Sequence, residues 1–334
     1  MLKIGLIGTG AMGTVHAYSW SQTPAQLVGA ISLEPEQTQR VCAPYGAQVY
    51  DDVDALIHDV DVVDVCTPTP THYEFVLKAA AAGKHVICEK PLGRTLAQGE
   101  EMVRTCREAG VHLLVGHVVR FFPEFELAKG RIDAGDIGRL SVIRLKRAGF
   151  QPHRGTSSWF LDFEQSGGLI LDLMIHDCDY ARWIAGEVES VYAKDVRSKE
   201  PGAKGDYALA ILRHASGAIT HLESAWAYPP PIFRTYFEIA GSDGLIEHAS
   251  QDSVPLGLHI DQQPGGDTTS IAIPQSPLKA DPWTLEIQHF YDVLTGTLPQ
   301  LRITAEDALA ALRLALAAIQ SAQTGRAVNI QEVQ

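Results

Sequence analysis

The chain opens with Leu2-Lys3-Ile4-Gly5-Leu6-Ile7-Gly8-Thr9-Gly10-Ala11-Met12-Gly13, the stretch that decides the fold of its first part. Leu2–Ile7 is a short apolar run typical of a buried strand, and Ala11–Trp20 continues as a helix. Of the three glycines in G-x-G-x-x-G, the first permits a tight turn and the second lets a pyrophosphate approach the backbone. The third permits close packing of helix and strand. The sequence therefore predicts a dinucleotide site formed by Gly8, Gly10, Ala11, Met12 and Gly13.

Strand and helix patterns then alternate as far as residue 116. Further strands are expected at Gln26–Ser32, Val49, Val62–Thr67, His85–Glu89 and His112–Gly116. Continuous apolar strands separated by helices indicate a parallel sheet covered on both faces. Open sheets of this kind bind ligands at the carboxyl ends of their strands. We therefore expect the residues that follow the strands to contribute to the cofactor site: Ser32, Thr67, Pro68, Thr69, His72, Glu89 and Lys90.

The end of the second strand bears on which dinucleotide binds. An acid there would hold the 2′-hydroxyl of the adenosine ribose, whereas a small residue beside a base would admit a 2′-phosphate. The position holds Ser32, followed by Leu33 and Glu34, and the nearest candidate base is the distant Arg40. Glu34 could still reach the ribose. The sequence leaves NAD and NADP both open as the cofactor.

Lys90 and His72 each admit two interpretations. A lysine at a strand end can polarise a carbonyl or take part in proton transfer, but it can also be a solvated loop cation. His72 stands at the start of a predicted helix, where it could be an ordinary first-turn residue or a cofactor contact.

Composition sets the broad class of protein. At 334 residues the chain is long enough for two domains. Its net charge of −13, without a block of like charges, argues against nucleic acid or an anionic membrane as a partner. No secretory leader and no apolar run long enough to span a bilayer is evident, so we expect a cytoplasmic protein. The five cysteines are scattered and are expected to be reduced.

A second stretch, Gly167–Trp183, carries the pattern expected of a catalytic helix. Asp172 and His176 lie four residues apart, which places them on one face of a helix. A carboxylate beside an imidazole can fix the tautomer of the ring and stabilise its protonated form, as a general base requires. A satisfied polar pair in a core helix is the alternative. Metal binding by His176, Asp177 and Asp179 is disfavoured because their spacing does not share that face, and no metal is expected.

Several motifs occur in an order that resembles one family, the Gfo/Idh/MocA oxidoreductases. They are Gly8–Gly13, Cys66–His72, Glu89–Leu92, Gly116–Phe121, the segment from Gly167 through Asp172 to His176, and Ser321–Arg326. The resemblance runs nearly end to end. It implies an N-terminal Rossmann domain and a C-terminal α/β domain with an open, mostly antiparallel sheet. It also implies NAD or NADP as cofactor, a polyol or sugar as substrate, and Lys90, Asp172 and His176 as catalytic residues.

Two positions depart from the family pattern. Ser32 replaces the common acid after the second strand, and His117 stands where many members have an amide or aromatic residue. The long loop Phe150–Ser166 leads into the catalytic helix, and loops of that length are often functional. We interpret it as a wall of the substrate site, with ordinary surface cover as the alternative. The candidate substrate residues are His117, His153 and Trp159.

The second half of the chain is predicted to be rich in strands. They are expected at Leu140–Gly149, Val188–Arg197, Tyr207–Arg213, Ala218–Ala227, Phe233–Ala240, Gly244–His248, Gly257–Asp261 and Thr268–Ile273, with hairpin turns at Ser216-Gly217 and Asp243-Gly244. Tyr207–Leu212 puts apolar groups on both faces of its strand, and an uncovered apolar sheet face usually marks an interface. We expect a homodimer or homotetramer formed through this sheet.

The predicted domains are residues 1–120, which bind NAD(P), and residues 121–334, which bind substrate and mediate assembly. Whether the last helix, Ala305–Thr324, packs back on the first domain is left open. The leading hypothesis is an NAD(P)-dependent dehydrogenase acting on a secondary alcohol of a cyclic polyol or sugar. The alternatives are a catalytically silent NAD(P)-binding regulator and an NAD-dependent glycoside hydrolase of the same fold.

Overall fold

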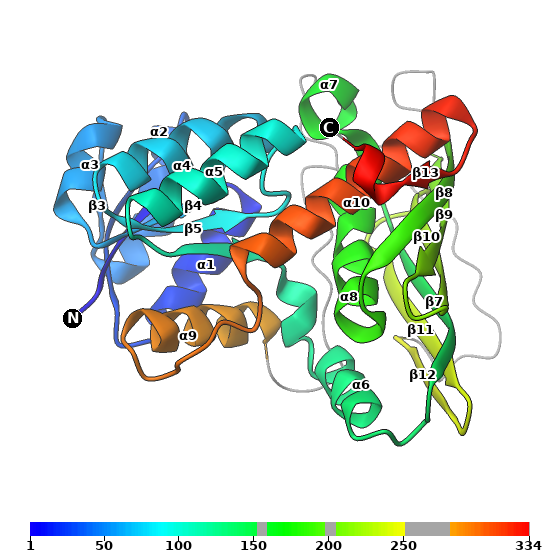
Figure 1. Cartoon of the computed structure of the whole chain (residues 1–334). Helices are drawn as coiled ribbons and strands as arrows, with labels where there is room; N and C mark the ends of the chain where they lie inside the picture. The colour runs from blue at the N-terminus through cyan, green and yellow to red at the C-terminus, as the bar shows by residue number, and fades with distance from the viewer. Residues whose placement is uncertain (152–158, 198–204, 251–280, 334) are drawn as a thin grey trace. The chain divides into compact units, whose positions relative to one another are not determined.

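The computed structural model describes residues 1–151, 159–197, 205–250 and 281–333 (Figure 1). The chain divides into two compact units. The first comprises Met1–Phe121 with Ala280–Leu309, and the second comprises Phe122–Lys279 with Ala310–Gln334. Residues 280–309 thus cluster with the first unit, although they follow residue 120 in the chain.

A six-stranded parallel sheet forms the centre of the first unit. Its strands, in spatial order, are β3 (Gln48–Val49), β2 (Gln26–Ile31), β1 (Lys3–Ile7), β4 (Val62–Val65), β5 (His85–Glu89) and β6 (Leu113–Gly116). This is the strand order of a doubly wound dinucleotide-binding fold, in which the order of the strands reverses between β1 and β4. Residues 62–65 of β4 and 113–116 of β6 are buried throughout, as expected for strands with both faces covered.

Helices cover this sheet on both faces. They are α1 (Ala11–Ser21), α2 (Pro35–Cys42), α3 (Val53–Asp59), α4 (His72–Ala81), α5 (Leu96–Glu108) and α9 (Pro282–Leu294), with short 3₁₀ turns at Ala43–Tyr45, Thr69–Thr71 and Val118–Phe121. The start of α5 is set locally, because Thr95 and Gln98 form a reciprocal capping box there. Helix α9 joins this unit because Ile287 and Phe290 enter the same core as Trp20. Their burial explains why the segment 280–309 belongs here.

The second unit is built on a seven-stranded mixed sheet. Its strands, in spatial order, are β12 (Leu245–Ala249), β11 (Phe233–Gly241), β7 (Leu140–Gly149), β10 (Ile219–Trp226), β9 (Asp206–His214), β8 (Val188–Val196) and β13 (Val328–Asn329). Among the described strands of this sheet, β7 and β10 pair in parallel and the other neighbours pair antiparallel. The expected open, mostly antiparallel sheet and both hairpins are therefore confirmed.

The remaining helices are α6 (Pro123–Asp133), α7 (Phe163–Ser166), α8 (Ile175–Ala185) and α10 (Ala305–Thr324), together with 3₁₀ turns at Trp159–Leu161 and Ile330–Glu332. Helix α10 begins in the first unit and ends in the second. Helix α8 packs on β7 and β10. Among the helices of the described residues, none combines the length and apolarity needed to cross a bilayer.

The two faces of the second sheet differ in exposure. Along β9, Ala208, Ala210 and Leu212 are buried, whereas Leu209 and Ile211 are 43% and 49% exposed. Tyr192 of β8 lies opposite Ile211 and is also exposed. The expectation of apolar groups on both faces of this strand is confirmed.

Several details depart from the sequence prediction. The helix expected across Gly167–Trp183 is not a continuous α-helix, because Ile170–Met174 forms a π-helix that precedes α8. β13, α7 and the 3₁₀ turn at Trp159–Leu161 were not anticipated. The strands expected at Gly257–Asp261 and Thr268–Ile273 lie outside the described residues. All five cysteines are free and buried.

Candidate active site

The turn between β1 and α1 requires glycine at two positions. Gly8 has a φ of +96°, and a Cβ there would lie 2.7 Å from the carbonyl oxygen of Cys66. A Cβ on Gly13 would lie 2.0 Å from the carbonyl oxygen of Gly8, so only glycine allows the helix to pack this closely. Gly10 is the N-cap of α1, which has no side-chain cap and no acidic residue in its first turn. Its first N–H groups therefore suit a phosphate.

Ser32 is bound into the loop that follows β2. Its Oγ accepts a hydrogen bond from the Thr9 hydroxyl at 2.8 Å and another from the backbone N–H of Glu34 at 3.1 Å. The Thr38 hydroxyl lies 2.8 Å from the same oxygen. Arg40 is exposed, and its Nε donates to Gln37. Ser32 therefore stabilises the loop after β2 by hydrogen bonds. It stands at the position where an acid commonly binds the ribose.

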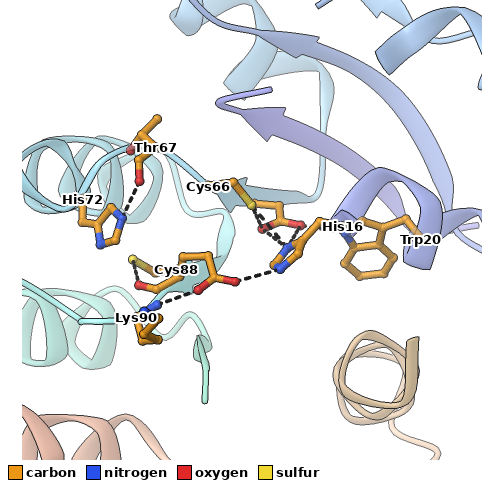
Figure 2. A network of polar contacts seen from close by, with 9 residues as sticks. His16, Trp20, Cys66, Thr67, His72, Cys88 and Lys90 are labelled. Atoms are coloured by element: carbon orange, nitrogen blue, oxygen red, sulfur yellow. Dashed lines mark hydrogen bonds and ion pairs between the residues drawn. The ribbon is translucent and has the colours of Figure 1, made fainter. Parts of the chain in front are cut away.

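The loops after β4 and β5 are joined by His72. Its Nε2 lies 2.9 Å from the carbonyl oxygen of Thr67 (Figure 2). Its Nδ1 lies 2.9 Å from the carbonyl oxygen of Pro91. Both partners are acceptors, so both contacts are hydrogen bonds only when the ring is doubly protonated. Burial disfavours that charged form and lowers the pKa of His72. At neutral pH the ring therefore donates to one carbonyl at a time.

A network of buried charges lies beside these loops. His16 of α1 has its Nδ1 3.0 Å from Asp64 of β4 and its Nε2 3.1 Å from Glu89 of β5. The Trp20 indole N–H donates to Asp64 at 2.8 Å, and the Cys66 sulfur lies 3.3 Å from His16 Nδ1 (Figure 2). His16 and Asp64 are fully buried.

Lys90 directly follows this network. Its side chain is partly buried, and its backbone N–H donates to Glu89 Oε2 at 3.0 Å. Glu89, which the sequence analysis assigned to the cofactor, thus also joins His16 to the backbone of Lys90.

Asp172 and His176 stand out by their exposure. From Leu169 to Ala181 every residue is buried except these two, which are half-buried. Asp172 lies in the π-helix and His176 in the first turn of α8. π-helical turns within helices occur frequently at functional sites. Within this apolar run, the two polar residues are thus the ones that are partly exposed.

Asp177, the residue after His176, is buried in an ion pair. Asp177 is buried and receives hydrogen bonds from the buried Arg147 of β7, with Nη2 at 2.9 Å and Nε at 3.1 Å. The Tyr180 hydroxyl donates to the carbonyl oxygen of Phe125 at 3.0 Å. These buried contacts fix α8 within the second unit.

The candidate substrate residues are only partly described. His117 is fully buried in the first unit, and Trp159 is half-buried and stacks on Phe160 with ring centroids 4.0 Å apart. His153 lies outside the described residues. The predicted site residues thus fall in both units: Lys90 and the cofactor set in the first, Asp172, His176 and Trp159 in the second.

Sequence reasoning missed His16 and Asp64. A signal was present, because Asp64 is the one polar residue of the buried strand Val62–Val65 and a buried charge requires a partner. His16 shares the inward face of α1 with Trp20, four residues on.

Comparison with known proteins gives consistent matches along the chain. A family model described as an oxidoreductase family with an NAD-binding Rossmann fold (Gfo/Idh/MocA) matches residues 2–117. The model of the Gfo/Idh/MocA C-terminal domain matches residues 125–247. Myo-inositol 2-dehydrogenase of Thermotoga maritima is 33% identical over 99% of this chain and 99% of its own length.

Two further similarities broaden the comparison. The 2,7-anhydro-N-acetylneuraminate hydratase of Escherichia coli is 28% identical over 100% of this chain and 98% of its own length. The crystal structure of a probable dehydrogenase from Thermotoga maritima has a TM-score of 0.82 and 31% identity, covering 99% of this chain and 100% of that one.

Proposed function

This chain belongs to the Gfo/Idh/MocA family of NAD-binding oxidoreductases, and from that premise we propose that it oxidises a secondary alcohol of a cyclic polyol or sugar. The observation that carries the proposal is the exposure pattern of residues 169–181, where Asp172 and His176 alone are accessible. An alcohol must lose a hydroxyl proton when its carbon gives up a hydride. A half-buried imidazole near a carboxylate in sequence suits that task.

The first unit fits a dinucleotide. The uncapped N-terminus of α1 offers backbone N–H groups to the pyrophosphate, and the close approach of Gly13 to Gly8 keeps the turn narrow. We propose NAD as the preferred form. Glu34 is an exposed acid in the ribose loop and would repel a 2′-phosphate, while the guanidinium of Arg40 is hydrogen-bonded to Gln37.

Each catalytic side chain has one proposed role. The bound nicotinamide supplies the hydride acceptor. His176 takes the proton from the substrate hydroxyl, and Asp172 orients the ring and stabilises its protonated form. Lys90 stabilises the negative charge that develops on the substrate oxygen.

The test is a panel of cyclic polyols and aldoses, followed by nicotinamide absorbance with NAD and with NADP. At least one cyclic polyol is expected to reduce NAD, with a higher kcat/KM than for NADP. The same panel run with His176→Ala is the control. If no member of the panel reduces either dinucleotide, the proposed function is wrong.

The hydratase relative motivates a second assay. Anhydro sugars are incubated with the enzyme and NAD, and sugar consumption is compared with net NADH formation. A dehydrogenase accumulates NADH in proportion to the product. Sugar consumption without net NADH would replace the proposal with redox-neutral chemistry on the same fold.

A further inference from the structure

His16 is enclosed by groups that favour its charged form. Both ring nitrogens face carboxylates, Nδ1 towards Asp64 and Nε2 towards Glu89, at 3.0 and 3.1 Å. A neutral imidazole has one N–H and can donate to one of these partners, whereas an imidazolium donates to both. The third titratable group facing the ring is the Cys66 thiol, at 3.3 Å from Nδ1.

The charges of the network also favour an imidazolium. Burial, the largest single cause, lowers the pKa of His16, but the charges of Asp64 and Cys66 and the hydrogen bonds to them together raise that pKa well above its ordinary value. Burial likewise raises the pKa of Glu89, yet the hydrogen bond from His16 and the charge of that ring bring it below its ordinary value. A buried carboxylate that lacked a cation would be strongly disfavoured.

Glu89 is held from three sides. Oε1 accepts from His16, and Oε2 accepts the backbone N–H of Lys90. On the neighbouring strand β6, Gly116 stands in register with Glu89, and a Cβ there would lie 3.2 Å from the carboxylate carbon. The carboxylate is therefore confined between His16, the strand β6 and the residue proposed to stabilise the alkoxide.

We propose that His16 is a positioning residue for Lys90: as an imidazolium between Asp64 and Glu89, it fixes the carboxylate that holds the backbone amide of Lys90. The inference rests on the role given to Lys90 under the proposed function. A metal site made of His16, Asp64 and Cys66 is the competing interpretation, since among the described residues these form the one cluster of suitable ligands. It is disfavoured because Trp20 and the ring already donate to Asp64.

The first experiment needs no substrate. The full-length enzyme, saturated with NAD and labelled with ¹⁵N in histidine, is titrated by NMR from pH 6 to about pH 9, and the signals of His16 are assigned from their loss in His16→Gln. We expect both ring nitrogens of His16 to keep imidazolium shifts at neutral pH. In Glu89→Gln, which keeps the shape of the side chain, the His16 pKa should fall. A neutral tautomer of His16 at pH 7, or zinc-dependent shifts of its signals, would overturn the proposal.

The second experiment measures the link to Lys90. Exchange of the Lys90 amide proton is followed in ¹⁵N-lysine enzyme for wild type, His16→Gln and Glu89→Gln. A hydrogen bond to a charged group contributes about 1.5–3 kcal/mol, so exchange should accelerate by about 10- to 10²-fold in both variants. The matched control is His85→Gln, because His85 also hydrogen-bonds within this sheet but at the opposite end of β5. It should leave exchange at Lys90 unchanged.

The third experiment is kinetic and uses a substrate that the enzyme has been shown to oxidise. His16→Gln should lower kcat by about 10- to 10²-fold, the scale of a small misplacement of a catalytic group, with KM and the Kd for NAD within about threefold. Folded His16→Gln with normal kcat and normal exchange at Lys90 would reduce His16 to a purely structural residue. If His16→Gln does not fold, Glu89→Gln decides by the same readouts. If no substrate reacts, the proposed function fails, but the two NMR experiments still test whether His16 fixes Glu89 and the Lys90 amide.

Discussion

His16 and His176 both lie on helices that pack against a sheet, yet the protein encloses one and leaves the other accessible. His16 is fully buried, and its nitrogens are engaged by Asp64 and Glu89. His176 is half-buried at the start of α8, in a run whose other members, apart from Asp172, are buried. The enclosed imidazole acts through the groups that it contacts, whereas a partly exposed imidazole can meet a ligand. The same residue type thus has a positioning role in one unit and a proposed catalytic role in the other.

The largest effect is expected at the accessible histidine. His176→Ala should lower kcat by about 10²- to 10⁴-fold, because the substrate hydroxyl then lacks its general base. The melting temperature should change little, since the side chain is half-buried. The measurement is kcat on NAD-saturated, folded enzyme, together with calorimetry. Near-normal turnover would show that His176 is not the general base, and the contrast with His16 would then not hold.

Its neighbour Asp177 should respond in the opposite way. Asp177→Asn leaves the buried Arg147 guanidinium without its counter-charge, and breaking a buried ion pair costs about 3–5 kcal/mol in the free energy of unfolding. Turnover per folded molecule should stay near normal. Urea unfolding measures the loss of stability, and kcat of the folded fraction measures turnover. The matched control, Arg147→Met with Asp177→Leu, removes both charges and should recover part of the lost stability.

The enclosed histidine should also give stability a specific pH dependence. Folding raises the pKa of His16, so its contribution is fully present below its unfolded pKa of about 6.5 and is lost as pH rises through the folded value. The difference in unfolding free energy between wild type and His16→Gln should therefore be about 1.5–3 kcal/mol at pH 6 and smaller at alkaline pH. Urea titrations at several pH values test this. A difference that grows with pH would contradict the raised pKa.

Accessible and buried residues also differ within the second sheet, where the exposed apolar face bears on self-association. We propose that a second copy of the chain covers Leu209 and Ile211. Ile211→Lys should weaken self-association at least about tenfold, because it would bury an unpaired charge. Light scattering over a range of concentrations measures it, with the exposed residue Leu127 of α6 changed to lysine as the control. A wild-type mass of 36.3 kDa at micromolar concentration, the mass of one chain, would contradict the proposed interface.

The smallest effect is expected when Asp172 is changed after His176 has already been lost. Asp172→Asn alone should damage turnover, because an amide cannot stabilise the protonated ring. Added to His176→Ala, it should cost less than about threefold more, since residues that act as one unit are non-additive. The assay compares kcat of both single variants and the double variant. Additive losses would show that Asp172 acts independently of His176.

Local pattern accounts for most of what could be predicted. The glycine turn at Gly8–Gly13 and the alternation of strands and helices follow from short-range sterics and hydrophobic period, and the structure has them at nearly the expected bounds. Asp172 and His176 are predicted from their spacing of four residues. The π-helix at Ile170–Met174 is not predicted, because the apolar residues there fit an α-helical pattern equally well.

The sequence by itself predicted most of the strands and helices of both units and the glycine turn, because hydrophobic period and turn residues are local. The resemblance to a family added the mostly antiparallel second sheet and the candidate catalytic residues Lys90, Asp172 and His176. Tertiary structure decided that α9 completes the core around Trp20, and that His16 lies between Asp64 and Glu89. Trp20 and Asp64 are 44 positions apart in the chain, and His16 and Glu89 are 73 positions apart. No local period encodes such pairings: they arise when strands β4 and β5 are laid side by side under α1, and the buried carboxylates must then share a cation.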